Sequence, residues 1–233
     1  MKNFLKKNWY IILINFVLIV GVFVFNALYL HNWKNGVPNS IHFKFVSSSC
    51  FATLGLINLL FICLRKRDKL NFSIAAAIAL VLCMAGDVAI EYQFIAGAAC
   101  FALGHVAFVI SFYFLKKFHW LDLVCSFVFA IPAVLFLILF KGFTFRDEVL
   151  RYVCAIYAMI IGFMFGKSLS NLIQSQTKLN ISIFVAATLF VVSDACLLME
   201  LFTPLDGTIT GLCCMAIYCP ALVLLGSLIY FRD

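Results

Sequence analysis

Eight long apolar runs follow one another along the chain, and short polar linkers separate them. Each run holds about 20 residues, the length of helix that spans the hydrocarbon core of a bilayer. Backbone groups in lipid must be hydrogen-bonded within their own segment, and no run shows the alternation of a strand. We therefore predict an all-α, polytopic integral membrane protein, a bundle of about eight transmembrane helices. The runs cover about residues 9–30, 45–64, 72–92, 94–115, 120–140, 149–169, 182–201 and 208–231.

Composition supports this fold class. Hydrophobic residues make up 65% of the 233 positions and charged residues only 12%, with a mean hydropathy of +1.11. A soluble domain needs more charge to cover its surface. Because the linkers are short, we expect a single transmembrane domain over residues 1–233. The first apolar run is too long for a signal peptide and no small-x-small cleavage site follows it, so we expect it to be retained as the first span.

Positive charge is unevenly divided between the two sets of linkers. If the N-terminus is cytoplasmic, twelve of the 17 Lys and Arg residues fall on the cytoplasmic side and five on the other. This excess follows the positive-inside rule, so we expect both termini in the cytoplasm, with the chain in the cell membrane if it is bacterial. The run RKRDK (65–69) is then a topology anchor. We expect the lipid bilayer as a partner and no nucleic acid.

Nearly all of the ten cysteines lie inside the apolar runs, and no Cys-x-x-Cys pair occurs. The vicinal residues Cys213 and Cys214 fall within one predicted helix. Cysteines of this kind act as small, polarisable apolar side chains. Their spacing favours neither a disulfide framework nor a zinc site. We expect no metal and no cofactor.

Three titratable residues lie well inside the apolar runs, away from the run ends: Asp87, His105 and Asp194. An acid at the centre of a spanning helix costs roughly 2.5–3.5 kcal/mol, so such residues usually face the bundle interior or a wet cavity and serve a function. With a cytoplasmic N-terminus, the alternating direction of the spans brings all three into the middle-to-outer half of the membrane. Glu91 follows Asp87 by one turn and Glu200 ends the seventh run, both near the outer surface.

Each of these residues alone also has a structural explanation. Glu91 and Glu200 fit interfacial acids that touch water, Asp87 fits a helix–helix hydrogen-bond partner, and His105 fits a core histidine with satisfied hydrogen bonds. Two acids and a histidine at one depth favour a common site. The other polar residues inside the runs are expected to make contacts between helices: Asn15, Asn26, Asn58 and the serines at 47–49.

A small residue followed by aspartate occurs in two of the apolar runs. Gly86-Asp87 in the third run and Ser193-Asp194 in the seventh are four spans apart and therefore oriented alike. This spacing suggests a weak 4+4 helix duplication with the site between the halves. Two short motifs do not by themselves establish a repeat.

Several short motifs lie along the spans: Gly86-Asp87, Gly97, Phe101 and Gly104-His105, the run LFVVSD (189–194), and Tyr157, Met164 and Tyr218. Together these motifs resemble the YhhN-type lysoplasmalogenase family, whose members are similar in length and are regarded as eight-helix membrane hydrolases. The chain departs from that family at Phe45, where a proline commonly follows the lysine, at Phe108, and at Leu222, and these departures remove polar groups near the site.

The resemblance implies hydrolysis of the vinyl ether of a lysoplasmalogen, an alkenyl-glycerophosphocholine or -ethanolamine, to a fatty aldehyde and a glycerophospho-headgroup. An enol ether is activated when an acid protonates its β-carbon, and water then captures the oxocarbenium ion. The catalytic candidates are Asp87 and Asp194, one as acid and one as stabilising carboxylate, with His105 positioning water. Which aspartate takes which role stays open. A low-dielectric site can keep a carboxylic acid protonated.

The substrate-binding candidates surround these groups. We expect the lysophospholipid chain to lie among the helices rich in phenylalanine and the headgroup to lie at the outer edge. Lys44, at the outer start of the second span, is expected to pair with the phosphate. Glu91, Tyr157 and Tyr218 complete the expected substrate contacts.

Two other classes of function stay open. A proton-coupled transporter would also carry acids and a histidine in mid-membrane, but no helices are strongly interrupted by Gly and Pro at matching positions. A metal-dependent membrane lipid amidase normally needs several metal ligands, and a single buried histidine makes a poor set.

Overall fold

The computed structural model describes residues 2–64 and 70–230, and these form eight α-helices. All eight are long and apolar enough to cross a membrane, which confirms the predicted fold class of a multi-pass, all-α membrane protein. RKRDK (65–69) lies outside the described residues. The helices are α1 (Lys2–Lys34), α2 (Ile41–Leu64), α3 (Leu70–Ala89), α4 (Phe94–Leu115), α5 (Trp120–Leu139), α6 (Glu148–Gln174), α7 (Lys178–Phe202) and α8 (Gly207–Leu228).

The helix ends differ from the ends of the apolar runs in both directions. Helix α6 continues to Gln174, beyond its apolar run, because backbone hydrogen bonding does not require apolar side chains. Helix α3 instead ends early, at Ala89, where the N–H of Gln93 closes the turn onto the Ala89 carbonyl. Glu91 therefore lies in the α3–α4 turn and not on the helix that carries Asp87.

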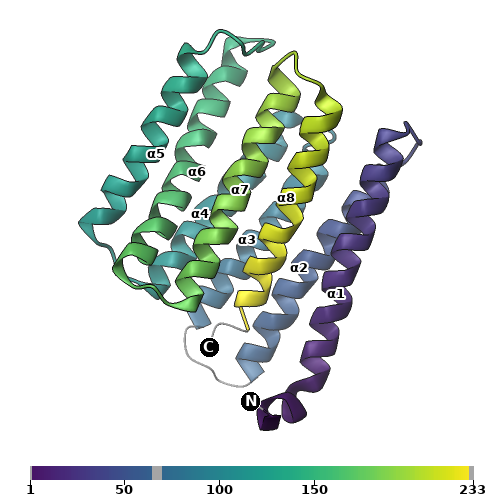
Figure 1. Cartoon of the computed structure of the whole chain (residues 1–233), viewed down its shortest axis with the longest axis vertical. Coiled ribbons are helices and arrows are strands. Elements are labelled where there is room, and N and C mark those ends of the chain that lie inside the picture. Colours follow the sequence, from purple (N-terminus) through teal and green to yellow (C-terminus); the bar gives the residue numbers. More distant parts are fainter. Residues whose placement is uncertain (1, 65–69, 231–233) are drawn as a thin grey trace.

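Helices that follow each other in the chain pack as antiparallel pairs: α1 with α2, α3 with α4, α5 with α6 and α7 with α8. Helices α1 and α5 lie at opposite edges of the bundle, and both ends of the chain lie at the same end of it (Figure 1). Burial follows this arrangement, since 56% of the apolar window of α3 is buried inside the bundle but only 22% of that of α1. The predicted site thus lies on central helices.

The contacts between pairs follow a repeated pattern. Helix α2 packs on α3 and on α8, and the corresponding helix of the second half, α6, packs on α7 and on α4. A duplication of four helices would produce this pattern, because α2 and α6 would then be equivalent. The correspondence is incomplete, because the backbones of α1 and α3 also come close to that of α8 whereas, among the described residues, those of α5 and α7 do not come close to that of α4. The 4+4 duplication stays a prediction.

Polar residues inside the spans connect the helices, as expected, with one exception. Asn15 and Asn58 exchange hydrogen bonds of 2.9 and 2.8 Å between α1 and α2. Asn26 donates to the Met215 carbonyl of α8. The exception is Ser49, which bonds to the Phe45 carbonyl of its own helix. Serine readily bonds to the carbonyl one turn earlier, so its presence in a span does not prove a contact between helices.

A glycine brings the α3–α4 turn close to α4. A Cβ atom at Gly97 would lie 2.5 Å from the Cα of Ile90, a backbone atom that cannot move away cheaply. Only glycine therefore lets the first turn of α4 pack directly on the segment that carries Glu91.

A buried ion pair joins α5 and α6 near the end of the bundle where the chain termini lie. The Lys167 ammonium lies 2.8 Å from Asp122 Oδ2, and both side chains are at most 2% exposed. Ser170 donates to the other carboxylate oxygen, and the backbone N–H of His119 also donates to Asp122. Lys167 further lies 4.1 Å from the centre of the Tyr113 ring.

Removal of Asp122 should destabilise the bundle. Asp122→Ala leaves the Lys167 charge buried without its partner, a change that costs about 3–5 kcal/mol in comparable pairs. We expect a clear fall in the thermal unfolding temperature of the purified protein in detergent. Glu148→Ala, at an exposed acid, is the matched control, and the double variant Asp122→Ala/Lys167→Met should recover much of the loss. Equal unfolding temperatures for Asp122→Ala and the control would contradict a stabilising role.

The side of the membrane on which the loops lie is testable separately. The positive-inside excess predicts that reporter domains fused after Lys117 report a cytoplasmic position and those fused after Lys141 an external one. Alkaline phosphatase and green fluorescent protein fusions measure the two positions independently. The reverse pattern would invert the orientation of the whole bundle and of the site.

Candidate active site

Asp87 is a buried carboxylate held by hydroxyl groups from two other helices. Ser48 of α2 donates to its Oδ2 atom at 2.5 Å, and the Tyr218 hydroxyl of α8 donates to the same atom at 3.0 Å. The residue is only 2% exposed. Among the described residues, the Oδ1 atom has no hydrogen-bond partner. The Oδ2 atom of Asp87 thus connects α3 to α2 and α8, and its Oδ1 atom remains available as a hydrogen-bond acceptor.

A second polar contact lies one helical turn away along α2, where this helix faces the turn between α3 and α4. The Lys44 ammonium of α2 lies 2.6 Å from Glu91 Oε1. Lys44 and Ser48 are four residues apart on α2. Asp87 precedes Glu91 by four residues on the antiparallel segment formed by α3 and the turn that follows it. The two contacts, Lys44–Glu91 and Ser48–Asp87, therefore follow from one register of α2 against α3.

Asp194 forms a separate cluster with two residues from α6 and α4. The Tyr157 hydroxyl donates to Asp194 Oδ2 at 2.6 Å. His105 Nε2 lies 2.8 Å from the Tyr157 oxygen and 3.3 Å from the same Oδ2 atom. Tyr157 gives its one hydroxyl proton to Asp194, so a hydrogen bond between His105 and Tyr157 requires the tautomer that carries the proton on Nε2. The other ring nitrogen, Nδ1, lies 3.3 Å from Met164 Sδ. The three groups form a chain of donors that ends on the carboxylate.

Aromatic rings separate the two aspartate clusters. The Phe190 ring packs 4.6 Å from the His105 ring on one side and 5.4 Å from the Tyr218 ring on the other, measured between centroids. Both contacts are edge-to-face, and Phe190 is fully buried. Among the described residues, Asp87 and Asp194 make no direct contact with each other. Both line the same cavity.

The polar cavity, of about 240 Å³, is lined mainly by α1, α7, α8 and the end of α3 with the turn after it, and also by the start of α2 and by α4. Asp87, Asp194 and Tyr218 line its inner part. Toward the helix ends opposite the chain termini, its wall continues with the Lys44–Glu91 pair and with Tyr29, Trp33, Glu200 and Gly211. The cavity thus carries four carboxylates and a single lysine, an unusual density of charge within a helix bundle.

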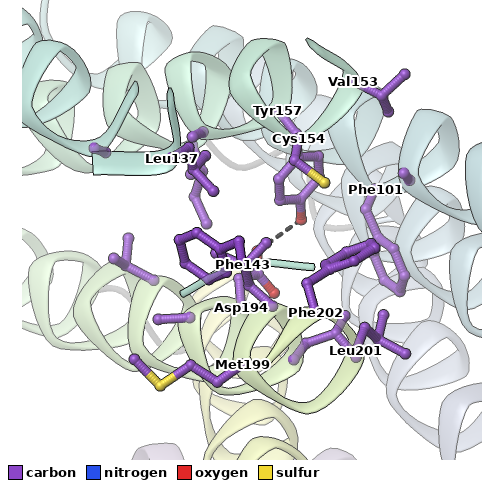
Figure 2. A pocket seen from close by; sticks show the side chains of 18 of the residues that line it. Phe101, Leu137, Phe143, Val153, Cys154, Tyr157, Asp194, Met199, Leu201 and Phe202 are labelled. Atoms are coloured by element: carbon purple, nitrogen blue, oxygen red, sulfur yellow. Dashed lines mark hydrogen bonds between the residues drawn. The ribbon is translucent and has the colours of Figure 1, made fainter. Parts of the chain in front are cut away.

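The apolar cavity, of about 200 Å³, lies between α4, α5, α6 and α7. Figure 2 shows its wall, where Leu137, Phe143 and Phe202 surround the space and the Tyr157 hydroxyl points to Asp194. Asp194 is the one acid in its lining, and it lines the polar cavity as well. The carboxylate of Asp194 therefore lies where the charged space and the apolar space meet.

The structure brings the predicted site residues into three positions. Asp87 and Tyr218 meet in the polar cavity, and Asp194 and Tyr157 meet at the border of the two cavities. Lys44 and Glu91 pair with each other near the helix ends. His105 is fully buried and lines neither cavity. It contacts the site through Tyr157 and Asp194, and its expected role in positioning water stays a prediction.

Ser48 donates a hydrogen bond to Asp87 but is not among the site residues predicted from the sequence. Ser48 lies within three consecutive serines, of which Ser47 bonds to the Val22 carbonyl and Ser49 to its own helix. The signal that distinguishes it is its spacing of one helical turn from Lys44, which mirrors the spacing of Asp87 and Glu91. That signal has meaning only once α2 and α3 are known to be neighbours.

Two of the three departures from the family pattern lie in the apolar core, and the third, Phe45, is half-buried near the start of α2. Phe108 is fully buried and its ring packs against those of Phe112 and Phe190. Leu222 is also fully buried, on α8. Neither Phe108 nor Leu222 lines either of the two cavities. The absence of a hydroxyl or amide group at these two positions therefore leaves the hydrogen bonds of the two aspartate clusters intact.

In the part of the chain that the structure describes, no three His, Cys, Asp or Glu side chains are grouped closely enough to hold a metal ion. The donors around Asp194 are a phenol and an imidazole, and those around Asp87 are two hydroxyl groups, which suits carboxylates that accept hydrogen bonds.

Comparison with known proteins supports the resemblance seen in the sequence. The sequence profile of the YhhN family matches residues 47–228. The chain belongs to the YhhN family. No match was found among curated proteins or among solved structures.

The YhhN match contains both aspartate clusters but not the whole polar cavity. Ser48, Asp87, Tyr157, Asp194 and Tyr218 all lie between residues 47 and 228. The α1 part of the cavity wall, with Tyr29 and Trp33, and Lys44 at the start of α2 precede the matched segment. The core of the site thus lies within the segment that the family profile matches, and the cavity wall near the helix ends includes residues outside the match.

Proposed function

We propose that the chain is a membrane-embedded ether hydrolase that cleaves the vinyl ether bond of lysoplasmalogens, releasing a fatty aldehyde and a glycerophospho-headgroup. The observation that carries the proposal is the position of Asp194 at the border of a charged cavity and an apolar one. A lysoplasmalogen has a charged headgroup and one apolar chain, and the vinyl ether joins them. A substrate that fills both cavities would bring this bond to Asp194.

The reaction needs an acid, a counter-charge and water. A carboxylic acid donates its proton to the β-carbon of the enol ether, and the electron pair of the double bond forms the new C–H bond. The resulting oxocarbenium ion is captured at the α-carbon by water, which returns a proton to the carboxylate. The hemiacetal then breaks its C–O bond to the glycerol, giving the aldehyde and the free glycerol hydroxyl. The sum is hydrolysis, with no oxidant or reductant.

The two aspartates differ in ways that suggest their roles. We assign proton donation to Asp194, because it alone lines both cavities. Asp87 accepts hydrogen bonds from Ser48 and Tyr218 and lies in the charged cavity only, which suits a carboxylate that stabilises the cation and orients water.

His105 and Tyr157 would act as positioning residues. They form a chain of donors, His105 Nε2–H to the Tyr157 oxygen and the Tyr157 hydroxyl to Asp194 Oδ2, which fixes the orientation of Asp194. This chain leaves Oδ1 of Asp194 free to face the reacting carbon. The Lys44 ammonium would bind the phosphate, with Glu91 as its partner when no substrate is bound. Tyr218 and Tyr157 line the substrate space on the two sides of Asp194.

Replacement of either aspartate should abolish turnover. Asp87→Asn and Asp194→Asn keep the shape of the side chain but remove the acid and the counter-charge. Loss of a buried acid should ease membrane insertion, by up to a few kcal/mol, so both variants should still purify as the wild type does. The measurement is aldehyde release from alkenyl-glycerophosphoethanolamine by the purified protein in detergent.

The matched control is Asp147→Asn, at the exposed start of α6, where asparagine caps the helix as well as aspartate does. It should keep full activity. His105→Ala should slow turnover without abolishing it, because Tyr157 still donates to Asp194. Wild-type rates for both catalytic Asp→Asn variants would rule out the two-carboxylate mechanism, and proton-coupled uptake by the wild type without aldehyde release would favour a transporter.

The same assay tests the role of metals. The proposed chemistry uses only carboxylates and water, so aldehyde release should be unchanged after treatment with EDTA and removal of the chelate. Loss of activity that added zinc restores would instead support a metal-dependent hydrolase.

A further inference from the structure

The part of the polar cavity farthest from the aspartates has a wall of its own. Four residues from three helices form it: Tyr29 and Trp33 from α1, Glu200 from α7 and Gly211 from α8. We call this set the α1–α7–α8 mouth. It lies at the end of the bundle opposite the chain termini, and none of its residues takes part in the chemistry proposed above.

Glu200 and Trp33 converge over a glycine in this mouth. A Cβ atom at Gly211 would lie 2.8 Å from the Trp33 Cη2 atom and 3.0 Å from Glu200 Oε1. Both side chains therefore occupy the space that any larger residue at this position would fill. Glycine here brings a carboxylate and an indole ring side by side at the cavity wall.

The Glu200 carboxylate is half-buried, and within the described residues it has no hydrogen-bond or ion-pair partner. The nearest cation lining the cavity, Lys44, is already paired with Glu91 at 2.6 Å. The other charged groups that face the cavity, Asp87 and Asp194, are acids with their own hydroxyl donors. The cavity thus holds one lysine that is paired with Glu91 and, in the mouth, a carboxylate that feels the Lys44 charge but has no direct partner among the described residues.

We propose that the α1–α7–α8 mouth binds the ammonium group of a zwitterionic phospholipid headgroup, with the phosphate on the Lys44 side. An ammonium ion fits an unpaired carboxylate beside an indole ring, because the ring face attracts cations and the carboxylate supplies the opposite charge. Tyr29 adds a second aromatic side chain to the same wall. The proposal names the headgroup class of the substrate, and to that extent it rests on the proposed function.

Headgroup charge gives a direct test that does not depend on turnover. The probes are two lysolipids with the same saturated ether chain, one with a phosphocholine headgroup and one with a bare phosphate. Neither has a vinyl ether, so neither is cleaved by the proposed reaction. Binding to the full-length protein in detergent is measured by native mass spectrometry. We expect the wild type to bind the phosphocholine lipid at least about ten-fold more tightly, which corresponds to about 1.4 kcal/mol.

Two variants should remove this preference by different means. Glu200→Gln removes the charge and keeps the shape, so phosphocholine binding should weaken about ten-fold while phosphate binding stays within about two-fold. Gly211→Ala leaves both binding groups in the chain but forces Trp33 and Glu200 apart, and it should weaken phosphocholine binding in the same direction. Glu148→Gln is the control, since it removes an exposed glutamate outside the cavity at the same end of the bundle.

The outcomes separate the two proposals. Equal affinity of the wild type for both lipids, or a preference that survives in Glu200→Gln, would overturn the assignment of the mouth. A preference that Glu200→Gln removes, together with no aldehyde release from any alkenyl lysolipid, would support the mouth and reject the ether hydrolase. Loss of preference in Glu148→Gln as well would point to a general surface charge effect and would also overturn the proposal.

Discussion

The need to satisfy a carboxylate inside lipid determines how this bundle closes. A buried acid away from water requires donors from the protein, and helices cannot offer backbone N–H groups at their centres. Asp87 finds its donors on α2 and α8, and Asp194 finds its neighbours on α6 and α4. Each aspartate thus connects three helices, and the register that satisfies these acids is also the register that builds the site.

The two clusters have equivalent positions but different chemistry. In each half, the aspartate on the third helix meets one residue from the second helix of its own half and one from the last helix of the other. Ser48 and Tyr218 fill these places around Asp87, and Tyr157 and His105 fill them around Asp194. If the halves arose by duplication, the substitutions between them explain why one acid faces only charged space and the other also faces an apolar cavity.

Features of this protein that depend on a single segment can be predicted from the sequence, whereas contacts between two segments cannot. Apolar length alone predicts eight spans, and the cost of burial alone marks Asp87, Asp194 and His105. The pairing of Lys44 with Glu91 and the role of Ser48 depend on how α2 packs against α3 and the turn after it. The sequence of either segment alone does not specify this packing. The cavities are further still from the sequence, because they are the space that side chains of four or more helices leave unfilled.

Burial of an acid is therefore not sufficient evidence of a functional site. Asp122 is as deeply buried as Asp87, yet Lys167, Ser170 and the His119 backbone occupy both of its oxygens, and it lines neither cavity. Asp87 and Asp194 each keep one oxygen without a partner among the described residues, beside a cavity. A fully compensated acid can only hold helices together, whereas an acid with a free oxygen at a cavity wall can also bind or protonate a ligand. Cavity contact and incomplete pairing, more than depth in the membrane, distinguish the site from the scaffold.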